Sequence, residues 1–124
     1  MKIFSLFLLM IFLSSCSENQ AVNSTEKIEF GAGYSLVSNA KTPFIQNNSL
    51  VATVTYSGCN DRQIFQLMGR NTGNTAELWL FKETPDQPCD AYFREERIFT
   101  IPVNFLMADS MVLITPDLER IVLR

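Results

Sequence analysis

The sequence predicts an all-β fold, an antiparallel β-sandwich or barrel of about seven or eight short strands. Runs rich in β-branched and aromatic residues recur about every ten residues, and turn-forming residues separate them. No long segment after residue 16 has the helical period of about 3.6 residues. The 124-residue chain is 47% apolar and 19% charged, which supports a single folded domain rather than a disordered chain.

Four strands are expected in the first half of the chain, separated by turn-forming residues. The clearest is Leu50–Tyr56, because it is rich in β-branched residues and runs into the turn residues Ser57 and Gly58. The four predicted strands are Lys27–Phe30, Tyr34–Val37, Leu50–Tyr56 and Gln63–Met68.

Four further strands are expected in the second half: Glu77–Lys82, Arg97–Val103, Met111–Thr115 and Arg120–Leu123. The glycine and asparagine residues of Gly69–Thr75 predict a turn before the first of them, and Pro116-Asp117 predicts a tight hairpin between the last two. Pro102 indicates an edge strand or a bulge, because proline donates no backbone hydrogen bond to a sheet. One helical turn is expected within Asn104–Ser110.

Five aromatic residues fall on these runs: Phe30, Phe65, Phe81, Phe99 and Trp79. We expect them to fill the core between two sheets, because large rings dominate the energetics of protein cores. The alternative is an exposed aromatic platform for sugars, which no spacing in the sequence favours.

The N-terminal segment has the composition of a secretory signal. Lys2 forms a short positive region, and the apolar stretch Ile3–Leu13 that follows is interrupted only by Ser5. A helix of this length measures about 16 Å, about half the hydrocarbon core of a bilayer. The segment is therefore predicted to direct export and not to span the membrane.

The end of this segment, Leu13-Ser14-Ser15-Cys16, resembles the lipobox of bacterial lipoproteins, in which a large aliphatic residue and two small residues precede a cysteine. The resemblance implies that residues 1–15 are removed as a signal peptide and that Cys16 carries acyl chains such as palmitate. A serine directly after the lipidated cysteine, here Ser17, resembles the pattern of lipoproteins that are sorted to the outer membrane. We therefore expect a protein of the bacterial cell envelope, anchored by lipid in the outer membrane and facing the periplasm or the cell surface.

The chain after the lipobox is predicted to have two parts. Residues 16–25 comprise the lipidated cysteine and a flexible tether, because Ser17–Thr25 has too few apolar residues to form a core. Residues 26–124 are predicted to form the single β-sandwich domain.

Cys59 and Cys89 are the only cysteines besides Cys16, and export would place them in an oxidising compartment. We expect a disulfide between them that joins two loops, because each cysteine lies beside turn-forming residues. A structural role is favoured over a redox-active one, since redox motifs have closely spaced cysteines.

The surroundings of this cysteine pair are similar to uncharacterised small envelope lipoproteins of diderm bacteria. The resemblance rests on the motif Tyr56-Ser57-Gly58-Cys59 and on Pro88-Cys89-Asp90-Ala91. In those proteins a histidine stands three positions after the first cysteine, where this chain has Arg62, so the role of that histidine is not carried over. The resemblance implies no established activity.

The composition excludes several classes of function. The chain has no histidine, the commonest general base and metal ligand, and its net charge of −3 argues against nucleic-acid binding. Carboxylates are the only remaining catalytic candidates: Asp86 with Asp90, Glu83 with Asp86, and Glu95 with Glu96. The last two should point to opposite faces of a strand, and all lie in charged segments typical of solvated surface. We expect no enzymatic activity.

No cofactor or metal ion is expected either. Asp86 and Asp90 flank a loop that lacks the spacing of a calcium loop. A zinc site would need Cys59 and Cys89 as thiolates, which a disulfide would prevent. No glycine spacing matches a phosphate-binding loop.

The sequence therefore predicts a non-enzymatic envelope lipoprotein that binds an envelope protein partner or serves as a structural component. The alternative is a periplasmic inhibitor of a hydrolase such as lysozyme. A partner surface is expected where the disulfide joins the loops, because loops form exposed surface and arginine and tyrosine are enriched at binding hot spots. The candidate residues are Asn60, Asp61, Arg62, Asp90, Tyr92 and Arg94.

Overall fold

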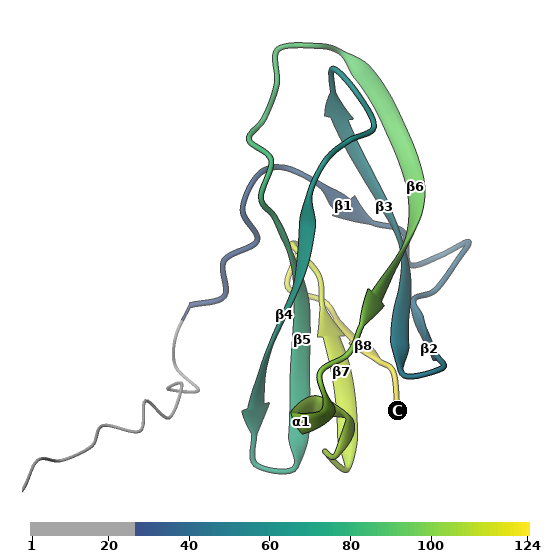
Figure 1. The fold of residues 1–124 in the computed structure, drawn as a ribbon, viewed down its shortest axis with the longest axis vertical. Coiled ribbons are helices and arrows are strands. Elements are labelled where there is room, and N and C mark those ends of the chain that lie inside the picture. Colours follow the sequence, from purple (N-terminus) through teal and green to yellow (C-terminus); the bar gives the residue numbers. More distant parts are fainter. Residues whose placement is uncertain (1–26) are drawn as a thin grey trace, which may run out of the picture.

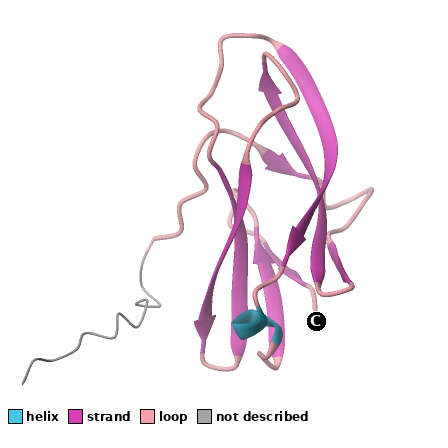
Figure 2. Ribbon diagram, in the orientation of Figure 1, coloured by secondary structure: helices cyan, strands magenta, loops and turns pink. Residues whose placement is uncertain are grey.

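Eight strands and one helical turn form residues 27–124, the part of the chain that the structure, a computed structural model, describes (Figure 1, Figure 2). The all-β prediction is confirmed. The predicted leader, Cys16 and the tether lie outside the described residues. The elements are β1 (Ser35–Leu36), β2 (Phe44–Gln46), β3 (Ser49–Gly58), β4 (Phe65–Thr72), β5 (Thr75–Lys82), β6 (Ala91–Thr100), α1 (Val103–Leu106), β7 (Ser110–Ile114) and β8 (Arg120–Val122).

The strands form two sheets of four strands each. In the first sheet β6 pairs with β3 from Ser49 to Gly58, while β1 and β2 pair with opposite ends of the other edge of β3. The second sheet has the order β4-β5-β7-β8. All these pairings are antiparallel except that of β5 with β7.

The two sheets pack face to face around one apolar core, as the sandwich prediction requires. Alternate residues of β3 point inward and meet alternate residues of β5 and β7, which is the period of a half-buried strand. At the lower end of Figure 1, Phe105 and Leu106 of α1 pack against this core. In residues 27–124 no helix is long and apolar enough to cross a membrane. The core residues without solvent exposure are Leu50, Val54, Ala76, Leu78, Leu80, Met111 and Leu113.

Some predicted strand boundaries differ from the structure. Lys27–Phe30 forms no strand, and only an isolated bridge joins Gly31 to Lys82. β2 was not predicted, because three residues are too few for a recognisable alternation. The predicted turn over Gly69–Thr75 is shorter, because β4 continues to Thr72 and Gly73, with φ of 60°, supplies the positive φ that the turn needs.

β6 begins at Ala91 and ends at Thr100, so Pro102 lies just beyond the strand and precedes α1. The edge-strand prediction is confirmed, since within residues 27–124 β6 pairs only with β3. The strand was predicted to begin only at Arg97, because the charged residues before it are typical of solvated surface. In the structure Glu95 and Arg97 point inward, opposite Val54 and Ala52. Inward-pointing charges on an edge strand oppose pairing with another chain.

The aromatic residues are divided between the core and the surface. Phe65 is a core residue, and Phe30 and Phe99 pack against the core. The core prediction is wrong for Trp79 and Phe81, which alternate with the buried Leu78 and Leu80 and therefore lie on the outer face of β5.

Gly31 fixes the N-terminal segment to the end of β5. Its φ of +74° lies in the left-handed region, and a Cβ at this position would lie 2.2 Å from the carbonyl oxygen of Lys82. The Lys82 N–H donates to the Phe30 carbonyl at 2.9 Å, and the Ala32 N–H donates to the Lys82 carbonyl at 3.1 Å. Glycine is therefore required at this close approach of two backbones.

Candidate functional site

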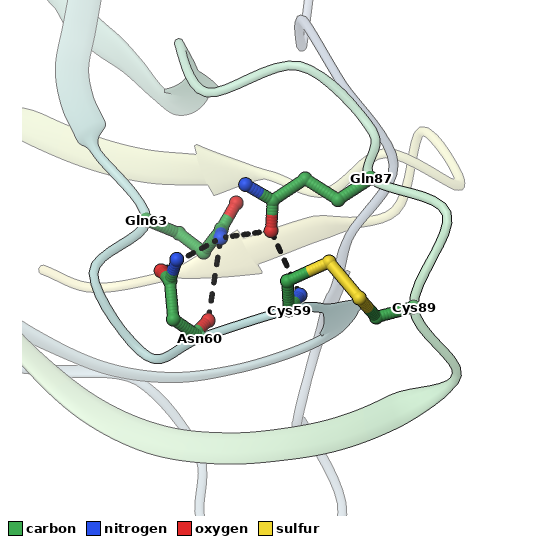
Figure 3. The surroundings of a disulfide bond; sticks show 5 residues. All are labelled: Cys59, Asn60, Gln63, Gln87 and Cys89. Carbon is green, nitrogen blue, oxygen red and sulfur yellow. Dashed lines mark hydrogen bonds between the residues drawn. A yellow bond between two sulfur atoms is a disulfide. The ribbon is translucent and has the colours of Figure 1, made fainter.

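The Cys59–Cys89 disulfide is present, which confirms the predicted pairing (Figure 3). Its Cα atoms are 4.8 Å apart. Cys59 directly follows Gly58, and Gly58 is the register partner of Ala91 at the start of β6. The bridge therefore continues the β3–β6 ladder as a covalent link between residues 59–64 and residues 83–90, which we call the linked loops. They lie at the upper end of Figure 1, opposite α1.

A cluster of side-chain amides supports the disulfide (Figure 3). The Gln87 Oε1 atom accepts hydrogen bonds from the Cys59 backbone N–H at 2.8 Å and from Gln63 Nε2 at 3.0 Å. Gln63, which is only 2% exposed, also donates to the Asn60 carbonyl at 3.3 Å. Gly58 leaves room for this cluster, because a Cβ there would lie 3.1 Å from Gln87 Oε1. The hydrogen bonds of these amides thus connect the two linked loops in addition to the disulfide.

The second linked loop is also fixed at its beginning. The Ile64 N–H donates to Thr84 Oγ1 at 2.7 Å, and the buried Lys82 Nζ donates to the Thr84 carbonyl at 3.0 Å. The Gly33 N–H donates to Asp86 Oδ1 at 2.9 Å, and Lys82 Nζ lies 4.0 Å from the same oxygen. A loop without regular structure is therefore held at Thr84 and Asp86, in addition to Gln87 and Cys89.

A polar network lies inside the sandwich below the loops. The Tyr56 hydroxyl donates to Glu95 Oε1, and Arg97 Nε donates to Glu95 Oε2 at 2.7 Å. Arg97 Nη2 also donates to the Gln63 carbonyl at 3.0 Å, which joins β6 to the first linked loop. Burial, followed by the hydrogen bond to the Glu95 carboxylate, raises the pKa of Tyr56 to about 12.

A second buried tyrosine, Tyr34, also has its hydroxyl group fixed by a hydrogen bond. Burial also raises the pKa of Tyr34, whose hydroxyl donates to the Leu80 carbonyl. Both phenols therefore stay neutral near pH 7.

A surface cavity of about 400 Å³ opens between the second linked loop and the first sheet. Its lining combines hydroxyl groups with one carboxylate and one amide. Tyr92, 69% exposed, forms part of its rim. The lining residues are Gly33, Tyr34, Ser35, Thr55, Tyr56, Ser57, Asp86, Gln87 and Tyr92.

The predicted partner residues do not all lie in loops. Asn60, Asp61, Arg62 and Asp90 are exposed on the linked loops. In contrast, Tyr92 and Arg94 belong to β6, where they face outward opposite Ser57 and Thr55. Only Tyr92 of the predicted set lines the cavity. The disulfide therefore brings the two groups to one end of the molecule, while the cavity is built largely from other residues.

The candidate carboxylates each have a structural partner or remain in solvent. Glu95 faces inward to Tyr56, whereas its neighbour Glu96 faces outward and pairs with Lys41, as the opposite-face prediction requires. Glu83 accepts from Gln66 Nε2 at 3.0 Å. Within residues 27–124, no group of three acidic or cysteine side chains is arranged to hold a metal ion.

The side chains that hold the linked loops in place were not predicted from the sequence. Gln63, Lys82 and Gln87 are polar residues next to turns, a pattern that is typical of ordinary surface. The burial of Gln63 and Lys82 depends on the pairing of β3 with β6 and of β4 with β5, so only the long-range topology reveals it. The only feature of the sequence that indicated their proximity was the pair Cys59 and Cys89, which predicted that the two loops are joined.

Comparison of the chain with protein-family models, with curated proteins and with solved structures gave no match.

Proposed function

We propose that the protein is a lipid-anchored binding module of the bacterial envelope, without enzymatic activity, that engages a protein partner through the linked loops. One observation carries the proposal: a loop wall without regular structure is fixed by a disulfide and by backbone N–H groups that donate to the Gln87 and Asp86 side chains, next to the exposed Tyr92. This supports a binding role, because exposed loops often carry binding residues and loops fixed before binding lose less entropy when they bind.

The energetic reason concerns the cost of ordering. A flexible loop loses conformational entropy when it binds, and this loss reduces affinity. Cys59–Cys89 and the Gln63–Gln87 amide pair remove part of this freedom during folding. Tyr92 then offers a large rigid side chain, and Arg62 and Arg94 offer charge-assisted hydrogen bonds, the features that dominate interface energies.

The proposal is tested by affinity capture from envelope extract with tagged protein, followed by binding measurements on the captured partner. Arg62→Ala with Arg94→Ala is expected to weaken binding by about 2 kcal/mol or more without a change in melting temperature. Tyr92→Ala should have a similar effect, because it removes the exposed ring at the cavity.

The matched control is Lys41→Ala, which removes a cation from the loop between β1 and β2 that pairs with Glu96. Its affinity should equal that of the wild type. Unchanged affinity in the Arg62 and Arg94 variant would place the interface elsewhere. Stoichiometric capture of a single hydrolase, with loss of the hydrolase's activity, would assign the inhibitor function instead of the proposed one.

The lipid anchor is tested separately, at Cys16. Cells grown with radioactive palmitate are expected to label the wild-type protein and not the Cys16→Ser variant, because the other two cysteines form the disulfide. A Cys59→Ser, Cys89→Ser variant serves as the control and should keep the label. Label that persists after Cys16→Ser contradicts the lipobox interpretation.

A further inference from the structure

The outer face of the second sheet carries an aromatic surface that shares no residue with the cavity beside the linked loops. Trp79 and Phe81 are two residues apart on β5, so both point away from the core, about 7 Å apart along the strand. On β4, Met68 is the register partner of Trp79 and Gln66 is the register partner of Phe81. Four side chains therefore form a two-by-two block on a sheet face, with Met68 40% exposed.

The block forms the floor of a surface cavity of about 510 Å³. The N-terminal segment supplies the remaining wall through Lys27 and Glu29, which Gly31 fixes beside the end of β5. The cavity thus lies within the size range of small-molecule sites, which combine an apolar floor with a few polar groups that orient the ligand.

The position of the Trp79 ring is set before any ligand arrives. The Arg70 guanidinium carbon lies 5.9 Å from the ring centroid, and Arg70 Nε donates to Glu77 Oε1 at 3.2 Å. Since Glu77 is itself buried, this chain of contacts holds the arginine against the ring. A ring that does not need to be ordered loses less entropy on binding.

The polar groups of the cavity wall offer both donors and acceptors. Among the described residues, the side chains of Lys27 and Glu29 make no hydrogen bond or ion pair, and Gln66 donates to Glu83, which leaves its Oε1 atom as an acceptor. Hydroxyl groups can both donate to and accept from such a set. The C–H bonds on the flat face of a pyranose ring carry partial positive charge and pack on the negative face of an aromatic ring.

We propose that this cavity, which we call the Trp79 site, binds a neutral oligosaccharide whose sugar rings pack on Trp79 and Phe81. Glu29, Gln66 and Lys27 then hydrogen-bond the ring hydroxyls. Two aromatic rings that follow one another along β5 suit an extended β-1,4-linked chain, because such a chain presents flat ring faces along its length. An apolar protein partner fits this site less well, since the cores of protein interfaces are depleted in charged residues such as Lys27 and Glu29.

Trp79 is the only tryptophan of the chain, so its fluorescence reports on this site alone. The purified full chain is titrated with cellotetraose and with the tetramer of N-acetylglucosamine. A saturable change in Trp79 emission is expected with at least one of them. Sorbitol, an acyclic polyol without a flat ring face, should cause no change at equal concentration of hydroxyl groups.

Two variants keep the reporter and remove the proposed contacts. Phe81→Ala should weaken binding about tenfold, the effect of one lost ring contact. Gln66→Ala changes an exposed side chain and should weaken binding about three- to tenfold, the effect of one lost hydrogen bond. Phe44→Ala removes an exposed ring from the other sheet and should leave the affinity unchanged.

Three results would overturn the proposal. The first is emission that responds to neither tetramer. The second is emission that changes only with protein concentration, which would assign the face to a second copy of the chain. The third is a sugar response that Phe81→Ala and Gln66→Ala leave unaltered while circular dichroism shows both variants folded. Because Tyr92 and the linked loops do not line the Trp79 site, this test is independent of the proposed partner surface.

Discussion

Replacement of both Cys59 and Cys89 by serine is expected to lower the free energy of unfolding by about 3.7 kcal/mol at 25 °C. The bridge has a sequence separation of 30 residues, and closure of a loop of this length restricts the unfolded chain by about that amount. A domain of this size has a total stability of only about 5–15 kcal/mol. The melting temperature should therefore fall by about 15 °C or more.

The fold should survive this change while the linked loops open. The hydrogen bonds from Gln63 to Gln87 and from Gly33 to Asp86 remain, but each is worth only about 1 kcal/mol. Amide hydrogen exchange should therefore increase in residues 83–90 and stay slow in the central strands β3 and β5. Urea unfolding measures the stability, and wild-type protein treated with a reductant is the control, since it should reproduce the double variant.

Two results would contradict this account of the bridge. One is a loss of stability below about 1 kcal/mol, which is well under the expected entropy of loop closure. The other is detection of two free thiols, rather than one linked peptide pair, by mass spectrometry of protein taken from the envelope without reductant.

The fold class could be predicted because local alternation and turn residues agree along most of the chain. Leu50–Tyr56 and Glu77–Lys82 were recognised from β-branched and apolar runs, and both lie within central strands. The parallel pairing of β5 with β7 could not be predicted, since it depends on a connection through β6 and α1. The alternation of residues along a strand assigns each residue to one of two faces, but it does not show which face packs against the other sheet.

This ambiguity explains the errors at both candidate sites. Both faces of β5 carry large apolar residues. The sequence pattern therefore did not distinguish Trp79 and Phe81, which face outward, from Leu78 and Leu80, which lie in the core. On β6 the charged residues suggested a loop, yet inward Glu95 is satisfied by Tyr56 and by Arg97. In each case the contacts with a strand distant in the sequence decide which face is buried. These contacts cannot be read from the sequence alone.

Glu77 occupies the outer face of β5 in a buried charge cluster, only 5% exposed. Its Oε1 atom accepts from Thr72 Oγ1 at 2.7 Å and from Arg70 Nε at 3.2 Å, and its Oε2 atom accepts from Arg120 Nη1 at 2.7 Å. Burial alone raises the pKa of this carboxyl. The hydrogen bonds from Thr72, Arg120 and Arg70 outweigh burial, so the pKa of Glu77 lies below its ordinary value of 4.5.

We expect Glu77→Gln to lower the free energy of unfolding by about 2–3 kcal/mol at pH 7, as measured by urea unfolding. Loss of one partner from a fully buried ion pair costs about 3–5 kcal/mol. The expected loss is smaller here because the Arg120 side chain is 54% exposed, and water solvates it once the carboxylate is gone. Glu119→Gln is the matched control: this carboxylate is exposed, and its removal should change the stability by less than about 0.5 kcal/mol.

The same pair of proteins gives a pH test whose sign follows from the lowered pKa. A carboxyl that binds its proton less readily in the folded state than in the unfolded state stabilises the fold while it is ionised in both. The stability difference between the wild type and Glu77→Gln should therefore be complete above about pH 5 and should shrink as the pH falls below 4.5 and through the folded pKa. A difference that stays constant down to about pH 3 would mean that the shape of the Glu77 side chain, and not its charge, holds Arg70 and Arg120 on this face.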